Sequence, residues 1–270
     1  MIIGIVGAGV VGKALVEGFK RKGHGTFFND IFFNDICPIK GFISKKELAE
    51  KCDVIFVCVP TPSLSDGEIM LKHVYDVLGD FDRFHKCPPL IIKSTVIPGT
   101  TLKLMEVYPR LIIANNPEFL REKTALQDFL NPDRTVIGSL YPNVSKLLLN
   151  LYSDFTGAKI LTDPSTSEMI KYVSNIFLVM KVAYVCEVHR VCSALGIDAA
   201  EVMRGVGFDK RIGTSHLNPN LGPISTYSPC LPKDILAFTI FLEQNGIDNG
   251  FFKRILECGI KTECNNRSKG

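Results

Sequence analysis

A cysteine in the last part of the chain has the surroundings of a nucleophile. Cys230 is followed by Leu231 and then by Pro232, a residue suited to the first position of a helix. Cys230 would therefore lie just ahead of a helix N-terminus, where the helix dipole and the neighbouring Lys233 both favour the thiolate. The thiolate is the reactive form in covalent catalysis. On these residues alone, an inert loop cysteine is an equally good interpretation.

Lys171 and Asn175 form a second candidate group. They are four residues apart in a segment with helical periodicity, so both side chains leave the same helix face. An ammonium and an amide on one face can both donate hydrogen bonds to a developing oxyanion. Such a pair is more often solvated surface. Its position favours the functional interpretation, because Ser-Thr-Ser-Glu at 165–168 predicts a capping box at the start of this helix.

A glycine-rich turn near the N-terminus predicts a dinucleotide site. Gly7, Gly9 and Gly12, with Val10 and Val11 between the last two, follow an apolar strand and open a helix. The first glycine permits the tight turn, the second lets a pyrophosphate approach the backbone, and the third allows close helix–strand packing. The helix N-terminus stabilises the phosphate charge.

An acidic residue at the end of the second strand would determine the selectivity for NAD over NADP. Asp30 lies about 20 residues beyond the turn, where a carboxylate accepts a hydrogen bond from the ribose and repels a 2′-phosphate. A tandem repeat, Phe-Phe-Asn-Asp-Ile at 27–31 and 32–36, offers Asp35 as a second candidate at a stretched spacing. We expect Asp30 to be the ribose contact, the repeat to form a loop, and the cofactor to be NAD.

The order of strands and helices predicts the scaffold that positions these groups. The expected strands are 2–6, 26–29, 54–59, 90–93, 111–114 and 135–137. Several are continuous Val/Ile runs, as in parallel strands covered on both faces. Residues 1–162 are therefore predicted to form an α/β domain with a Rossmann-type doubly wound parallel sheet. A long connecting helix to about Leu195 and a smaller all-helical domain would follow over 163–260, with a frayed tail at 261–270.

Composition narrows the classes of protein. The 270-residue chain is 46% hydrophobic and 22% charged, which excludes wholesale disorder, and its net charge of +3 gives no argument for nucleic acid. Its nine cysteines and five histidines contain no CxxC pair and no ligand spacing, so we expect no metal. We expect no membrane span, because no apolar run reaches roughly 20 residues. We expect a cytoplasmic location, because Met1 leads straight into a strand.

Five further motifs, in this order, resemble those of the UDP-glucose/GDP-mannose dehydrogenase family. They are Val-Pro-Thr-Pro at 59–62, Lys-Ser-Thr-Val-Ile-Pro-Gly-Thr at 93–100, Asn-Pro-Glu-Phe-Leu-Arg-Glu at 116–122 continuing to Asn-Pro-Asp-Arg at 131–134, Glu-Met-Ile-Lys-Tyr-Val-Ser-Asn at 168–175, and Cys-Leu-Pro-Lys-Asp at 230–234. Any one of them is weak evidence. Their joint occurrence in order is specific, and the likeness extends from Gly4 to about Asp234.

The resemblance implies a reaction and a catalytic set. Two successive hydride transfers to NAD would carry the C6 alcohol of a nucleotide sugar to the acid, through a thiohemiacetal and then a thioester on Cys230. Lys171 and Asn175 would stabilise the oxyanion, and Asp234 would help Lys171 and a water act as acid and base. The remaining members of the implied set, which would position that water, are Glu118 and Thr95.

The resemblance also implies which residues bind the ligands. Besides the glycine turn and Asp30, the cofactor contacts would be Pro60, Thr61, Thr95, Glu122 and Lys233. The substrate contacts would be Glu118, Phe119, Leu120, Arg121, Lys171, Asn175, Cys230 and Arg211, the last reaching the substrate of a neighbouring subunit. The long helix would form the seam of a homodimer.

Two features depart from the family pattern. Ser-Thr-Tyr-Ser-Pro at 225–229 replaces the adjacent glycines that usually precede the cysteine, and Pro229 fixes its own φ, lacks an N–H donor and restricts Ser228. A displacement of about 1 Å can lower a rate on the order of 10²-fold. Family members also commonly continue into a further α/β domain that grips the nucleotide. We therefore expect substrate binding to use less of the chain, with help from a partner subunit, or the substrate to be smaller.

Two other functions remain open on the sequence. A short β-hydroxyacid dehydrogenase also combines a glycine turn, a Lys-xxx-Asn helix and a helical second domain, but it performs one oxidation and needs no cysteine; the motifs at 116–122 and 230–234 count against it. A catalytically impaired homologue that binds NAD and nucleotide sugar would retain the cofactor site without turnover.

Overall fold

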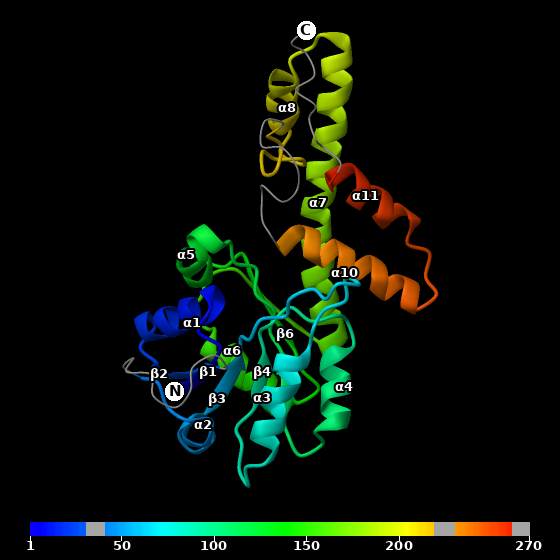
Figure 1. Ribbon diagram of the computed structural model, residues 1–270. Helices are drawn as coiled ribbons and strands as arrows, with labels where there is room; N and C mark the ends of the chain where they lie inside the picture. The colour runs from blue at the N-terminus through cyan, green and yellow to red at the C-terminus, as the bar shows by residue number, and fades with distance from the viewer. Residues whose placement is uncertain (31–40, 219–229, 261–270) are drawn as a thin grey trace. The chain divides into compact units, whose positions relative to one another are not determined.

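The computed structural model describes residues 1–30, 41–218 and 230–260 (Figure 1). The chain divides into two compact units, one made of Met1–Pro62 and Ile69–Lys171, the other of Ser63–Glu68 and the chain from Tyr172 onward. The second copy of the tandem repeat with Asp35, the loop at 225–229, the tail at 261–270 and the side chain of Cys230 lie outside the described part.

The first unit is built on a seven-stranded sheet in the order β2-β1-β3-β4-β5-β6-β7. The strands are β1 Ile2–Val6, β2 Gly25–Asn29, β3 Val54–Val57, β4 Leu90–Ile92, β5 Ile113–Asn115, β6 Arg134–Gly138 and β7 Ala158–Thr162. Strands β1 to β5 pair in parallel. Strand β6 is antiparallel to β5, and β7 is parallel to β6. The mostly parallel sheet confirms the predicted fold class, with a reversal of strand direction at β6.

Helices cover both faces of this sheet (Figure 1). Alternate strand residues point to opposite faces, so the continuous apolar run of β3 supplies both cores. Val54 and Phe56 join the core under α1 Val10–Arg21, α5 Ala125–Leu130 and α6 Pro142–Leu151. Ile55 and Val57 join the core under the other helices, which are α2 Lys45–Lys51, α3 Lys72–Asp82 and α4 Thr100–Val107. The sheet is therefore doubly wound, as predicted.

Strand β7 is not among the predicted strands. It lies at the edge of the sheet next to β6, and its residues are exposed or half-buried along their whole length. A continuous buried apolar run, the signal that identifies the central strands, is therefore missing here.

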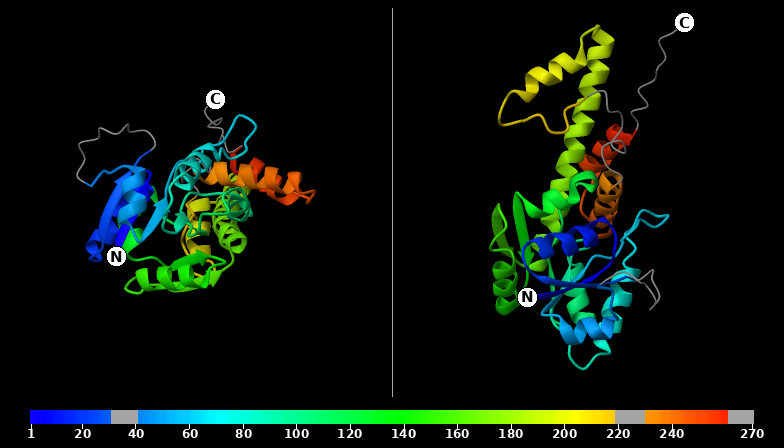
Figure 2. Two further views of the ribbon diagram at one scale, coloured as in Figure 1. Left: turned by 90° about the horizontal axis from the view of Figure 1, so that it is seen from below. Right: turned by 90° about the vertical axis from the view of Figure 1, so that its left-hand side faces the viewer.

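The long connecting helix, α7 Pro164–Leu195, is a single continuous helix of 32 residues (Figure 2). The predicted capping box at its start is wrong. Asp163, directly before Pro164, accepts the hydrogen bonds of the Thr166 backbone N–H at 3.0 Å and of the Thr166 hydroxyl at 2.5 Å. The Glu168 carboxylate instead accepts a hydrogen bond from the backbone N–H of Thr101, at 2.8 Å, at the start of helix α4 in the same unit.

From Tyr172 onward, the described part of the second unit consists of helices joined by turns and loops. Helix α8, Ala199–Gly207, packs against α7 through Val185 and Met203. Helices α10, Cys230–Gln244, and α11, Gly250–Ile260, meet through the rings of Phe238 and Phe252, whose centres are 5.2 Å apart. Cys230 is the first residue of α10 and does not precede it, which corrects the predicted boundary. Its backbone still lies in the first helical turn, among the N–H groups without intrahelical partners.

The expectation of no membrane span stays a prediction. By length and composition alone, α7, Pro164–Leu195, is apolar enough to cross a membrane, and 39% of its most apolar 18-residue window is buried. The core helix of a water-soluble protein passes the same test, so the property by itself is weak evidence for a membrane span.

Candidate functional site

The glycine turn between β1 and α1 has the geometry that a dinucleotide requires. Gly7 has a φ of +111°, and a Cβ there would lie 2.4 Å from the carbonyl oxygen of Cys58. A Cβ on Gly12 would lie 1.8 Å from the carbonyl oxygen of Gly7. At Gly9, the residue before α1, a Cβ would meet nothing within 4 Å. The first and third glycines are therefore required by close packing, and the second leaves the backbone open to a pyrophosphate.

The turn lies where the strand order reverses. Strand β1 has β2 on one side and β3 on the other, so the loops after β1 and β3 flank the crevice in which such sheets bind ligands. Asp30 follows β2 and is buried, and its carboxylate accepts a hydrogen bond from the Ala8 backbone N–H in the turn. The structure thus brings the predicted ribose-binding acid to the turn, whereas its rival Asp35 lies outside the described residues.

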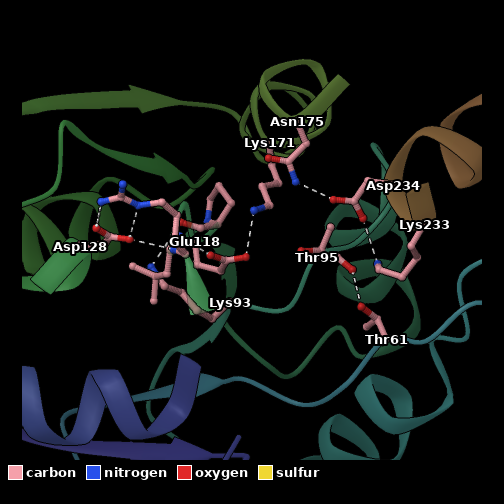
Figure 3. A network of polar contacts seen from close by, with 12 residues as sticks. Thr61, Lys93, Thr95, Glu118, Asp128, Lys171, Asn175, Lys233 and Asp234 are labelled. Carbon is pink, nitrogen blue, oxygen red and sulfur yellow. Dashed lines mark hydrogen bonds and ion pairs between the residues drawn. The ribbon is translucent and has the colours of Figure 1, made fainter. Parts of the chain in front are cut away.

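The loops after β3 and β4 are joined to each other. The Thr61 hydroxyl donates to the Thr95 carbonyl oxygen at 2.8 Å (Figure 3), and the Ser94 hydroxyl donates to the Val59 carbonyl oxygen at 2.6 Å. These bonds hold Pro60, Thr61 and Thr95 at the carboxyl edge of the parallel strands, the edge that carries the glycine turn.

A buried ion pair forms the centre of the site in the first unit. The Lys171 ammonium donates to the Glu118 carboxylate at 2.9 Å, with the two side chains 7% and 15% exposed (Figure 3). The second carboxylate oxygen accepts from the Leu120 backbone N–H at 2.6 Å, and Lys171 lies 5.5 Å from the centre of the Phe119 ring. Burial raises the pKa of the Glu118 carboxyl, but the charge and hydrogen bond of Lys171 outweigh it and hold the pKa below its usual value.

Lys93, a residue that the predicted site does not include, lies beside this pair. It follows β4, is 5% exposed, and donates to the Asn116 side-chain oxygen at 2.8 Å. Burial lowers the pKa of the Lys93 ammonium to about 8, while the negative charge of Glu118 acts in the opposite direction. A lysine directly after a continuous apolar strand was the sequence signal for it, since buried lysines are rare unless they are paired.

The second unit has a polar group of its own. The Asn175 amide donates to the Asp234 carboxylate at 2.6 Å, linking α7 to α10 (Figure 3). Asp234 is 1% exposed, and its other oxygen lies 3.0 Å from the Lys233 ammonium. The contact between Lys233 Nζ and Asp234 Oδ1 lacks the geometry of a hydrogen bond. It is therefore an ion pair between two buried atoms. Asp234 is four residues beyond Cys230 on α10, and Asn175 is four residues beyond Lys171 on α7.

The side chains of several predicted ligand contacts have other surroundings. The Arg121 guanidinium is paired with Asp128 at 2.6 Å on the surface. Arg211 is paired with Asp209 at 2.6 Å, and its side chain is 89% exposed. Glu122 is exposed in the short 3-10 helix η1, Glu122–Thr124. Leu120 packs against the core under α1. Their ligand contacts remain predictions.

The fold and the glycine turn define a Rossmann-type dinucleotide-binding protein. Residues 40–156 match the NAD binding domain of the UDP-glucose/GDP-mannose dehydrogenase family, and residues 165–259 match its central domain. The chain belongs to this family. The glycine turn precedes the first matched segment, and its assignment therefore rests on the geometry given above.

Three similar proteins show the extent of the likeness. A UDP-glucose 6-dehydrogenase of Rickettsia conorii is 39% identical over 216 residues, which are 77% of this chain and 49% of that protein. A UDP-glucose 6-dehydrogenase of Haloferax volcanii is 30% identical, covering 96% and 69%. The structure of a UDP-glucose dehydrogenase from Pyrobaculum islandicum superimposes with a TM-score of 0.84 at 30% identity, covering 96% and 67%. The chain spans about half the length of the first of these.

Proposed function

We propose that the protein oxidises the C6 alcohol of a nucleotide sugar to the carboxylate with two NAD. The observation that carries the proposal is the buried Lys171–Glu118 pair at the carboxyl edge of an NAD-binding sheet, one helical turn from an asparagine that is bonded to a buried aspartate. In the net reaction the alcohol, two NAD⁺ and one water give the carboxylate, two NADH and three protons.

The residues of the chain have distinct parts in this reaction. NAD, held by the glycine turn and Asp30, supplies the hydride acceptor. Lys171 and Asn175 donate to the oxygen on C6 as negative charge develops there. The Cys230 thiolate adds to the aldehyde formed first, and the resulting thiohemiacetal is oxidised to a thioester. Glu118 and Thr95 hold the water that hydrolyses the thioester, and Asp234 assists the proton transfers.

The test is a count of NADH formed per sugar consumed, with a panel of UDP- and GDP-sugars. We expect two NADH per sugar for the wild-type chain. Cys230→Ser should lower the rate of this four-electron oxidation by at least about 10²-fold, because a neutral hydroxyl is a far weaker nucleophile than a thiolate. Cys258→Ser, which changes a half-buried free cysteine of α11, is the matched control and should keep the full rate.

The result also separates the competing functions. One NADH per substrate, unaffected by Cys230→Ser, would indicate a single oxidation of the β-hydroxyacid type. NAD binding without NADH from any sugar would support the impaired homologue, which the sequence Ser-Thr-Tyr-Ser-Pro at 225–229 favours, because Pro229 restricts the backbone next to the nucleophile.

We further propose that a second copy of the chain covers an apolar stripe on α7. Its members are exposed and fall within about 40° of one another on a helix of 3.6 residues per turn; they are Val173, Phe177, Tyr184, Val191 and Leu195. The same helix carries Lys181, Glu187 and Arg190, charges that are unfavourable in a bilayer. A protein partner therefore suits the stripe better than lipid does. Arg211 is the residue predicted to reach the substrate of the second copy.

Tyr184→Glu is expected to convert a dimer into a monomer, because it places a charge in the middle of the stripe. Sedimentation velocity in detergent-free buffer measures the change. Ser193→Glu, on an exposed position of the same helix outside the stripe, is the control and should remain dimeric. A wild-type chain that sediments as a monomer at all concentrations contradicts the proposal.

A further inference from the structure

The buried Lys93 has no part in the reaction proposed above, yet it makes contacts at the base of the turn that carries Glu118. Its ammonium donates to the Asn116 side-chain oxygen at 2.8 Å and lies 3.3 Å from the Pro117 carbonyl oxygen. It is also 5.9 Å from the centre of the Tyr152 ring. Burying an ammonium is costly unless it is paired, so the charge must be matched by nearby groups.

Asn116 connects this lysine to strands β4 and β6 and to Tyr152, the residue that follows α6. Its side-chain oxygen accepts from Lys93 and from the Tyr152 hydroxyl, each at 2.8 Å. Its amide donates to the Val136 carbonyl oxygen of β6 at 2.6 Å, and its backbone N–H donates to the Ile92 carbonyl oxygen of β4 at 2.9 Å. Hydrogen-bonded buried polar networks of this kind favour one conformation. The turn from Asn116 to Glu118 is therefore held in place by the hydrogen bonds of Asn116 and Lys93.

The charges around Glu118 come from several elements. Lys171 of α7 is in direct contact, and Lys93 after β4 is close enough to lower the pKa of the Glu118 carboxyl by its charge. Arg134 of β6 lies over the ring of the adjacent Phe119, 3.9 Å from its centre. The Cys58 thiol after β3 is buried beside Lys93, and its pKa is raised to about 12, so it is neutral. Glu118 thus lies in the field of two ammonium groups.

We propose that Lys93 is a positioning residue for Glu118, holding the turn from Asn116 to Glu118 and keeping the carboxylate ionised and paired with Lys171. The inference rests on the proposed function in one respect, which is that Glu118 takes part in the reaction. Lys93 itself is bonded to Asn116 and Pro117 and acts on the reaction through Glu118.

The experiment measures the titration of Glu118 directly, by ¹³C NMR of labelled glutamate carboxyls, with Glu118→Gln identifying the signal. Lys93→Gln retains an amide donor for Asn116 and removes the charge. We expect it to raise the pKa of Glu118 by at least about one unit, a tenfold higher proton affinity, because an opposite charge near the carboxylate is lost. The acid limb of kcat/KM should move by the same amount.

Tyr152→Phe is the matched control, because it removes the other donor to Asn116 without a change of charge. It should leave the pKa of Glu118 within about 0.3 unit of the wild-type value. An unchanged Glu118 titration in Lys93→Gln overturns the proposal. If Lys93→Gln fails to fold, the proposal is tested by ¹³C NMR titration of labelled lysine in the wild-type chain. A Lys93 side chain that is neutral at pH 7 contradicts the proposal. Absence of turnover in every variant counts against the proposed function alone, because the NMR titration needs no activity.

Discussion

Replacing Lys171 with methionine is expected to lower kcat by about 10³-fold, the size of effect seen when an oxyanion donor that also serves in proton transfer is removed. Methionine keeps most of the length and volume of the side chain and removes the ammonium that lies 2.9 Å from Glu118. Because the chemistry is lost and the cofactor site is not, the Kd for NAD should change little. Steady-state kinetics and NAD titration measure the two quantities.

The same substitution should also destabilise the fold, by about 3–5 kcal/mol, since it leaves a buried carboxylate without its partner. The double variant Lys171→Met/Glu118→Gln removes both charges and is expected to recover most of this stability while remaining inactive. Lys146→Met, at an exposed position of α6, is the control for loss of one positive charge. A single Lys171 variant with kcat within about tenfold of wild type would falsify the assignment of Lys171 to the reaction.

The second large effect concerns Glu168, which supports the helix that carries Lys171. Its carboxylate accepts from the Gly99 N–H at 2.7 Å, the Thr101 N–H at 2.8 Å and the Thr101 hydroxyl at 2.5 Å, at the start of α4. Burial raises the pKa of the Glu168 carboxyl to about 7 from an ordinary 4.5, although these hydrogen bonds act in the opposite direction. The folded chain therefore retains a proton at pH values where the unfolded chain has released it.

The sign of the pH dependence follows from this difference. The stability linked to Glu168 is fully present below about pH 4.5 and is lost as the pH rises towards about 7, by up to about 3 kcal/mol. Glu168→Gln is neutral at every pH, so its stability lacks this pH-dependent contribution. Denaturant unfolding at pH 5 and pH 7.5 should therefore show the wild-type chain losing stability relative to Glu168→Gln as the pH rises.

Glu106→Gln, an exposed glutamate of α4, is the control for this comparison and should follow the wild-type pH dependence. A difference between wild type and Glu168→Gln that stays constant from pH 5 to 7.5 contradicts the raised pKa. In Glu168→Gln one acceptor for the Gly99 N–H is lost, and this changes the free energy of unfolding by an amount that does not depend on pH.

The sequence by itself determined the features that depend on local chain chemistry. The glycine turn could be predicted because Gly7 must adopt a positive φ and Gly12 must lie against a carbonyl oxygen, and glycine alone satisfies both. The central strands could be predicted because residues buried on both faces of a parallel sheet form unbroken apolar runs, as in β3. Lys171 and Asn175 could be placed on one helix face because their spacing alone decides it.

Only the tertiary structure decided which distant groups meet. Lys171 and Glu118 are 53 residues apart, and Asn175 and Asp234 are 59 apart. No local pattern reports which side chains share a strand edge or a helix crossing. The error at 165–168 has the same origin. The Ser-x-x-Glu spacing fits a capping box locally, but Asp163 accepts the capping hydrogen bonds and Glu168 bonds to the N–H groups of α4. A buried polar group goes to the partners that the fold brings within reach, because leaving it unpaired costs more than any local preference provides.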